Sequence, residues 1–360
     1  MKTLSTIILS LVCATTTMAQ TQTVEVLEYQ PAPGQYVNTL PTVAENATHA
    51  DACAEATTCL NKPNYMIHLG TFGGYVTVRF DHAIQNKRGS DILILGNGIF
   101  NKDTNGGSIE PGIVYVGVGS SLDDCQWYEL AGSEYYTSEI HDFSITYHKP
   151  TTEDFVSDYI KWECSWTEKD GTRRDSTGYH SKIGYHKQSY WPYWNADKET
   201  MTFSGGKLPN NAKNLSETGQ NWVQYRYSDD AYGYVDACAA NDSLNSSFDI
   251  DWAVDNEGNH VNLSEVNFIR IKTGIFQYCG WLGETSTEVK SITDLHLLAG
   301  YDDNPYLITP RTPTSIAAPT AKVTTGDSDD PYFIELTTGL RTRTPSHGIY
   351  IRGGKKYIFR

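Results

Sequence analysis

Residues 75–80 read Tyr-Val-Thr-Val-Arg-Phe, a run in which apolar and polar side chains alternate. This period of two is typical of a β-strand that buries one face. Residues 113–118, Ile-Val-Tyr-Val-Gly-Val, have the same character, and residues 91–95 form a compact apolar run. Turn residues separate such runs, as at Gly73-Gly74. These stretches therefore predict a chain built from short strands.

The same pattern continues toward the C-terminus. Further candidate strands are residues 143–147, 159–166, 200–203, 222–227, 248–254, 268–273 and 291–298. No segment between them indicates a helix. With about ten strands joined by hairpin-type turns, the sequence predicts an all-β fold, specifically a jelly-roll-like β-sandwich with a small C-terminal β-hairpin appendage.

Composition agrees with this fold class. Among the 360 residues there are 30 Gly, 24 Tyr and 8 Trp, while charged residues reach only 20%, which disfavours coiled coils and disordered chains. The formal net charge is −15. Nucleic-acid binding depends on basic side chains that neutralise phosphates, so we do not expect this acidic chain to bind nucleic acid.

The N-terminus resembles an export signal. Lys2 supplies a positive start, an apolar stretch follows, and Thr17-Met18-Ala19 offers a small-x-small cleavage site before Gln20. We therefore expect residues 1–19 to be a signal peptide and the protein to be exported, to the outer-membrane surface or the extracellular space. A lipid-modified Cys13 is the alternative, although Val12 is bulky for a lipoprotein signal. No later stretch has the ~20 apolar residues of a transmembrane segment.

Charge and composition divide the rest of the chain. Residues 20–300 are predicted to form the ligand-binding β-sandwich domain, residues 301–325 a Pro- and Thr-rich linker, and residues 326–360 a C-terminal β segment. Residues 341–360 contain six Lys or Arg and no acid, whereas residues 20–340 carry a net charge of −22. The C-terminal segment is therefore electrostatically opposite to the body.

The C-terminal segment, residues 334–360, ends in Gly-Ile-Tyr-Ile, a Gly-Gly turn and a Lys-Lys strand. This end resembles a short form of the type IX secretion sorting domain of Bacteroidota, and Pro313-Thr314-Ser315-Ile316 is similar to the usual start of that domain. The resemblance implies export or attachment by the secretion machinery. The alternative is a terminal hairpin that packs on the body.

The body contains a series of motifs in a fixed order, at residues 69–75, 80–82, 110–113, 127–134, 208–211, 248–255 and 277–288. Through these motifs it resembles a family of Bacteroidota cell-surface proteins often called PKD-domain-containing. The resemblance implies a jelly-roll sandwich. Some members are associated with outer-membrane nutrient uptake, including corrinoid capture, so the possible partners include an uptake machinery.

Catalytic motifs are absent, but acidic pairs are frequent. The sequence contains no GxSxG, HExxH or P-loop. Asp249 and Asp251 would share one face of the expected strand at residues 248–254 and could bind a cation or act as acid and base. A solvated strand face is the simpler interpretation. Two further pairs have the same ambiguity: Glu129 with Glu134, and Glu284 with Glu288.

One segment suggests calcium as a cofactor, and no other cofactor is indicated. Asn101-x-Asp103-x-Asn105-Gly106 copies the opening of an EF-hand loop, and Glu110 lies close by in sequence. Position twelve of the loop, however, is Gly112 rather than a bidentate Glu. A Ca²⁺ site at Asn101, Asp103, Asn105 and Glu110 and an ordinary polar turn are both open interpretations.

Aromatic side chains provide the candidate ligand-binding surface. Tyr190, Trp191, Tyr193 and Trp194 place four rings within five residues, and His186 precedes them. Exposed rings of this kind stack on the C–H faces of sugars or on a corrin ring, so the expected ligand is a glycan or a corrinoid. The alternative is that the rings pack in the core and anchor the loop.

Six cysteines follow the leader, an even number that is compatible with disulfides in an exported chain. Only Cys53 and Cys59 suggest a pair, because five residues between them could close a short surface loop. No CxxC occurs, so the sequence supports neither a zinc ribbon nor a redox motif.

Together these features favour a secreted or cell-surface, non-catalytic binding protein for a nutrient ligand, glycan or corrinoid. Two other classes stay open. A glycan-active enzyme would use paired carboxylates, and a structural or adhesion module would bury its aromatic loop completely.

Overall fold

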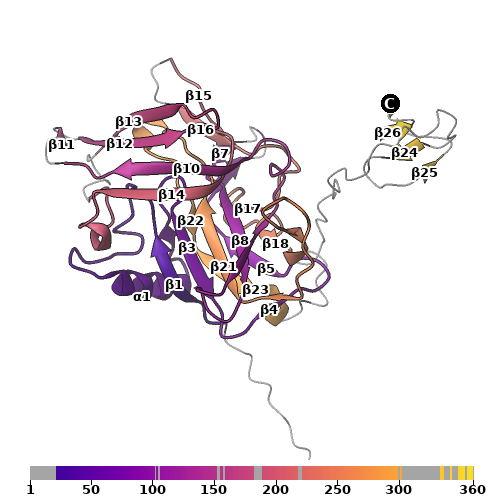
Figure 1. Cartoon of the computed structure of the whole chain (residues 1–360), viewed down its shortest axis with the longest axis horizontal. Helices are drawn as coiled ribbons and strands as arrows, with labels where there is room; N and C mark the ends of the chain where they lie inside the picture. Colours follow the sequence, from indigo (N-terminus) through magenta and orange to yellow (C-terminus); the bar gives the residue numbers. More distant parts are fainter. Residues whose placement is uncertain are drawn as a thin grey trace, which may run out of the picture.

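The computed structural model describes residues 22–101, 103, 106–151, 155–156, 159–181, 189–217, 221–298, 301, 333–335, 341–342, 348–352 and 355–359. Within these residues most of the regular secondary structure is antiparallel strand, so the prediction of an all-β sandwich is confirmed. Figure 1 shows β10, β12 and β14 running across the upper ends of β3, β21 and β8.

The larger sheet has seven strands and carries most of the core. In spatial order they are β1 (Glu25–Gln30), β3 (Tyr75–Arg79), β21 (Phe268–Thr273), β8 (Gly112–Val118), β9 (Gln126–Leu130) and β19 (Ala253–Val254), with β17 (Tyr234–Val235) also paired to β8. The alternation at residues 75–80 gives β3, whose Val76 and Val78 are completely buried. Its other face places Thr77 beside Glu28 and Arg270, which it contacts by hydrogen bonds of 2.9 and 2.8 Å. One strand face therefore builds the core and the other a polar network.

The second main sheet has five strands. They are β11 (Phe155–Val156), β12 (Tyr159–Thr167), β10 (Ile140–His148) and β14 (Thr200–Lys207) in spatial order, with β13 (Arg173–Ser181) on the other edge of β12. Phe143, Ile145 and Tyr147 alternate along β10 and pack with Phe72 and Phe203 in a separate apolar cluster. The Tyr147 hydroxyl donates a hydrogen bond of 3.0 Å to the Phe72 carbonyl, which ties this sheet to the loop before β3.

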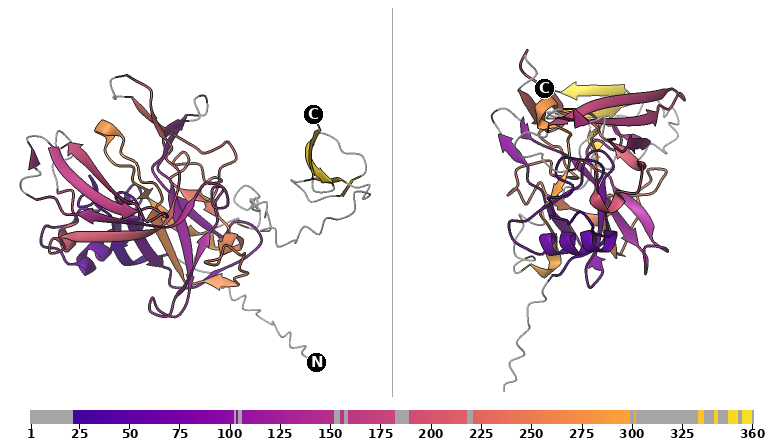
Figure 2. Two further views of the ribbon diagram at one scale, coloured as in Figure 1. Left: turned by 45° about the horizontal axis from the view of Figure 1, so that its top comes forward. Right: turned by 90° about the vertical axis from the view of Figure 1, so that its left-hand side faces the viewer.

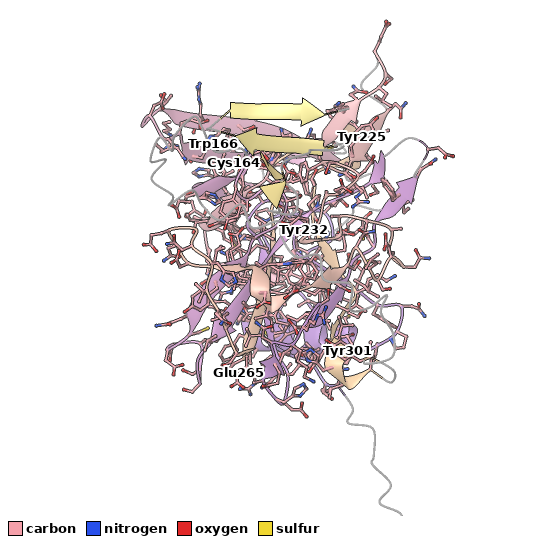
Figure 3. All side chains as sticks on the ribbon, turned by 90° about the vertical axis from the view of Figure 1, so that its right-hand side faces the viewer. Cys164, Trp166, Tyr225, Tyr232, Glu265 and Tyr301 are labelled. Carbon is pink, nitrogen blue, oxygen red and sulfur yellow. The ribbon has the colours of Figure 1, made fainter. Side chains whose placement is uncertain are left out.

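Smaller antiparallel sheets complete the body. They are β15 (Ala212–Asn214), β16 (Trp222–Tyr225), β7 (Gly106–Ser108) and β6 (Ile99–Asn101); β18 (Ser247–Phe248), β5 (Ile92–Leu95) and β23 (Ser291–Asp294); β2 (Ile67–His68) with β22 (Glu288–Val289); and β20 (Glu265–Val266) with β4 (Ile84–Gln85). Short 3₁₀ turns lie at Tyr193–Asn195, Ile250–Trp252, Gly280–Leu282 and Leu295–Leu297. In Figure 3, Cys164 and Trp166 of the five-stranded sheet lie at one end of the body, and Glu265 and Tyr301 at the other.

One helix, α1 (His49–Leu60), was not expected from the sequence. It lies beside β1 (Figures 1 and 2). A capping box starts it: the Thr48 side chain accepts from the Asp51 amide, and the Asp51 carboxylate accepts from the Thr48 amide. Its buried face includes Cys53 and Cys59. Both thiols are free, so the predicted disulfide across a short surface loop is wrong, because the segment between them is helical.

A second correction concerns residues 248–254. Instead of one strand, β18 ends at Phe248 and a 3₁₀ turn covers Ile250–Trp252. Asp249 is buried and caps that turn by accepting a 2.9 Å hydrogen bond from the Asp251 amide, while Asp251 is exposed. The two carboxylates therefore do not form the like-facing pair expected on a strand.

The C-terminal segment forms its own sheet, composed of β25 (Arg341–Thr342), β24 (Phe333–Glu335), β26 (Gly348–Arg352) and β27 (Lys355–Phe359). The expected hairpin is present, since β26 pairs with β27 with Arg352 opposite Lys355. Two further strands extend it. The predicted leader and most of the predicted linker lie outside the described residues. Among the helices of the described residues, none has the length and apolarity needed to cross a membrane.

Candidate functional site

An open pocket of about 920 Å³ lies where the two main sheets meet. The seven-stranded sheet contributes Tyr115, Trp127, Glu129 and Lys272, and the five-stranded sheet contributes His141 and Gly206. The loop before β10 and the turn after β19 complete the wall with Tyr135, Tyr136, Glu139, Asp255 and Glu257. Its size is in the usual range of small-molecule sites.

A β-bulge shapes one side of this pocket. Ile140 pairs with Lys207 and Phe143 with Gly205, so His141 and Asp142 on β10 face the single residue Gly206 on β14. Asp142 adopts a left-handed conformation with φ 59° to accommodate the extra residue. A bulge re-aims side chains where it interrupts a ladder, and both residues of this one, His141 and Asp142, line the pocket next to Glu139.

Glycine is required opposite the bulge. A Cβ atom built on Gly206 would lie 1.8 Å from Oε1 of Glu139, well inside van der Waals contact. The Gly206 amide also donates a 3.2 Å hydrogen bond to the Tyr115 hydroxyl. Gly206 thus lets the Glu139 carboxylate lie against the backbone of β14.

Two carboxyl groups meet inside the pocket wall. Ligand atoms of Glu129, Glu139 and His141 all lie within 4.8 Å of one another. Burial, followed by the charge of Glu139, raises the pKa of Glu129 well above its usual value, while the Tyr115 hydroxyl acts in the opposite direction. Contact with Glu139 also raises the pKa of His141.

A lysine lies beside this group. Burial lowers the pKa of Lys272 to about 8, partly offset by the charge of Glu129. Its Nζ donates a 2.9 Å hydrogen bond to the Ser204 carbonyl and lies 5.1 Å from the centre of the Tyr115 ring. Through these contacts the Lys272 amine links β21 to β14 and β8. It is therefore not only a counterion of Glu129.

The aromatic rings of the pocket differ in exposure. Tyr136 is 49% exposed, and its hydroxyl donates a 3.1 Å hydrogen bond to the Gly258 carbonyl across the rim. Tyr135 is buried and packs edge-to-face on Tyr136 and tilted on His141. Trp127 is half-buried under the Arg270 guanidinium at 4.0 Å. Tyr136 is therefore the ring best placed to meet a ligand.

The aromatic loop at residues 190–194, predicted as the binding surface, is largely buried. Tyr190 and Trp191 are only 2% and 3% exposed and belong to the apolar cluster of the five-stranded sheet. Trp194 is half-buried and packs on Tyr29, and the Tyr193 amide donates to Asn38. The prediction of an exposed four-ring platform is therefore wrong, because two rings fill the core. His186 lies outside the described residues.

The described members of the predicted calcium site, Asn101, Asp103 and Glu110, have other partners. Asn101 and Gly106 pair at the closing end of the β6–β7 hairpin, and the Asn101 side chain accepts a 2.9 Å hydrogen bond from the Asp103 amide, as in an ordinary Asx turn. Asn105 lies outside the described residues. Glu110 is used elsewhere: Oε1 accepts hydrogen bonds from the Ser286 amide and Gln224.

Glu110 belongs to a buried polar network around His68. Nδ1 of His68 lies 2.6 Å from Glu288 Oε1, and Nε2 lies 3.5 Å from Glu284 Oε1. Asp236 accepts hydrogen bonds from the amides of Asn97, Gly98 and Glu288. Despite burial, the two glutamates raise the pKa of His68 to about 9. The pair Glu284 and Glu288, noted in the sequence, therefore does come together. It does so in the core, where both carboxylates are counterions of His68.

Of the residues singled out in the sequence, only Glu129 lies in the pocket, with Glu134 in the adjoining turn. Four further residues of the pocket were not predicted from the sequence: Tyr136, Glu139, His141 and Lys272. One signal was present: Glu139 and His141 have the i, i+2 spacing that shares a strand face, directly after a loop rich in tyrosine. A scan against models of known protein families and a search of curated proteins both found no match.

Proposed function

We propose that this chain is a non-catalytic binding protein that takes a glycan in the pocket between its two main sheets. The observation that carries the proposal is the lining of that pocket. An exposed aromatic ring, Tyr136, lies at the rim, and carboxyl, imidazole and hydroxyl groups lie around it. Sugars combine apolar C–H faces with many hydroxyl donors, so both parts of the lining have a use.

The pocket favours a glycan over a corrinoid. A volume of about 920 Å³ with an open mouth accommodates a few sugar rings. A corrinoid is a macrocycle with a nucleotide arm and needs a broad apolar platform. The aromatic loop expected to supply that platform is largely buried, which leaves the corrinoid as the alternative outcome of the binding test.

A glycan-active enzyme is the second candidate, supported by the raised pKa of Glu129 next to a second carboxyl group. Retaining glycosidases place their two carboxyl groups about 5–5.5 Å apart and expose both to the sugar. The side chain of Glu139 has no exposed surface, so it cannot attack a substrate. Release of reducing sugar from a polysaccharide that disappears in Glu129→Gln would favour the enzyme instead.

Removing the Tyr136 ring tests the binding proposal. Tyr136→Ala is expected to weaken glycan binding by ~1–3 kcal/mol, the scale of an aromatic contact at a binding site, with little change in melting temperature because the ring is 49% exposed. Calorimetry with the hexaoses of cellulose, mannan, xylan and chitin, and with cyanocobalamin in parallel, measures the effect.

Tyr65→Ala is the matched control, because Tyr65 is 54% exposed and is not among the residues that line the pocket. Tyr136→Phe keeps the ring and should keep most of the affinity. Equal affinity in wild type and Tyr136→Ala would place the glycan elsewhere, and binding of cyanocobalamin alone would replace the glycan by a corrinoid.

Export is the second part of the proposal. The leader-like N-terminus and the basic C-terminal strands β26 and β27 support a route to the cell surface of a Bacteroidota-type bacterium. Deleting residues 314–360 is expected to leave a body that melts as before but no longer appears at the surface, as measured by protease accessibility on whole cells. Undiminished surface display would remove the role of the tail.

A further inference from the structure

The wall of the glycan pocket contains a group of ligand atoms whose hydrogen bonding is incomplete. Glu129 on β9, Glu139 just before β10 and the bulge residue His141 converge there, with one ligand atom of each within 4.8 Å of the others. They come from the two different sheets, so the fold itself holds them together.

Glu139 is the decisive member. Its side chain has no exposed surface, yet neither carboxylate oxygen receives a hydrogen bond from the described residues. Oε1 of Glu129 is also buried and without a donor. Buried polar groups are almost always hydrogen-bonded, and a buried charge without a partner is strongly unfavourable. At one place, three buried carboxylate oxygens therefore lack a hydrogen-bond donor from the described part of the chain.

His141 adds a fourth acceptor. Its Nε2 lies 3.1 Å from the Tyr135 carbonyl, which can only accept, so Nε2 carries hydrogen and donates. In the neutral ring Nδ1 then presents a lone pair, and it lies 3.5 Å from Oε1 of Glu139. Metal-binding histidines show this arrangement, in which one nitrogen donates to a carbonyl and the other faces the ion.

We propose that Glu129, Glu139 and His141 bind a divalent transition-metal ion, which presents its remaining coordination positions to hydroxyl groups of the glycan. Two carboxylates with an imidazole suit Zn²⁺ or Mn²⁺, whereas Ca²⁺ and Mg²⁺ prefer oxygen ligands throughout. The ion supplies the positive charge that the three acceptors require. The glycan contact deepens the proposed function and rests on it, but the metal site does not.

Two other arrangements would satisfy these oxygens without a metal ion. A second proton on His141 would let Nδ1 donate to Glu139, 3.5 Å away, and one proton could be shared between the two carboxyl groups. The Lys272 amine already donates to the Ser204 carbonyl. Both proton arrangements predict no metal binding, so a direct binding measurement separates them from the metal site.

The test is a calorimetric titration of the chelator-treated full chain with ZnCl₂ and MnCl₂, without glycan. Wild type is expected to bind one ion at this site. Loss of an outer-shell partner costs ~10- to 100-fold in metal affinity. Because Glu139 and His141 are proposed as direct ligands, Glu139→Gln and His141→Ala should each lower the affinity for the ion by at least that factor. Glu257→Gln is the matched control, since Glu257 is an exposed acid lining the same pocket.

Folding of each variant is checked by circular dichroism, and wild type alone is sufficient to overturn the proposal. No heat and no rise in melting temperature at millimolar Zn²⁺ and Mn²⁺ would contradict it, as would binding that persists unchanged in both variants. The second result would place the ion elsewhere, for example at Cys53 and His49, whose Sγ and Nε2 lie 3.7 Å apart.

A glycan titration before and after chelation separates the two proposals. Weaker glycan binding after chelation supports both the metal and its contact with the sugar. Metal binding with no glycan binding under any condition retains the ion and removes the proposed function. Equal glycan binding with and without metal overturns the proposed contact.

Discussion

Trp191→Ala is expected to lower the free energy of unfolding by ~3–5 kcal/mol, the cost of truncating a buried aromatic residue. Trp191 is 3% exposed and packs in the apolar cluster of the five-stranded sheet. Its indole N–H also donates a 2.9 Å hydrogen bond to the Asn195 carbonyl. In the variant that carbonyl loses this donor. Urea denaturation followed by circular dichroism measures the loss.

Tyr65→Ala is a suitable comparison, because that ring is 54% exposed and its removal should cost less than about 1 kcal/mol. Glycan affinity of folded Trp191→Ala should match wild type. A stable Trp191→Ala variant that has lost ligand binding would instead restore the loop at residues 190–194 as the binding surface.

His68→Leu is expected to cost a similar ~3–5 kcal/mol, because it removes the cationic partner of two buried carboxylates. His68 is 1% exposed and lies between Glu284 and Glu288. Asp236, which is buried, and Glu110, which is half-buried, face Glu288 from the other side of the network, and both have raised pKa values. His260→Leu, at an exposed histidine, is the control.

The pH dependence of this difference identifies its cause. Folding raises the pKa of His68 from 6.5 to about 9, so its contribution to stability is complete below pH 6.5 and is lost as pH rises through 9. The stability difference between wild type and His68→Leu should therefore shrink by ~3 kcal/mol between these limits. A difference that does not change with pH would mean that His68 contributes through packing alone.

Alternation of side chains predicted the strands well where one face is buried. Residues 75–80 and 113–118 became β3 and β8, neighbours of the central strand β21. The helix α1 was not predicted because the stripe that it buries consists mostly of small residues: Ala52, Cys53, Ala56, Cys59 and Leu60. Thr48 and Asp51 of its capping box nevertheless have the characteristic spacing. At residues 248–254, an aspartate that caps a 3₁₀ turn interrupted the expected strand.

The site was harder to predict, because its residues come from strands that are distant in sequence. The sequence does not show that Glu129, on β9, meets Glu139 and His141, because β9 and β10 belong to different sheets. The β-bulge at His141 is equally hidden in the local pattern. The density of aromatic residues at 190–194 led to the wrong binding surface. Hydrophobicity alone does not distinguish a core ring such as Trp191 from a rim ring such as Tyr136. That distinction depends on the long-range pairing of strands, which local pattern does not contain.

Amide hydrogen exchange of the full chain, with and without the glycan selected by calorimetry, tests most directly whether the inter-sheet pocket is the binding site. Protection is expected in residues 135–142, 204–206 and 254–258, which form the pocket wall. Unchanged exchange in these three segments, with protection confined to residues 189–195 or to the second pocket around residues 60–64 and 290–293, would show that the ligand binds elsewhere.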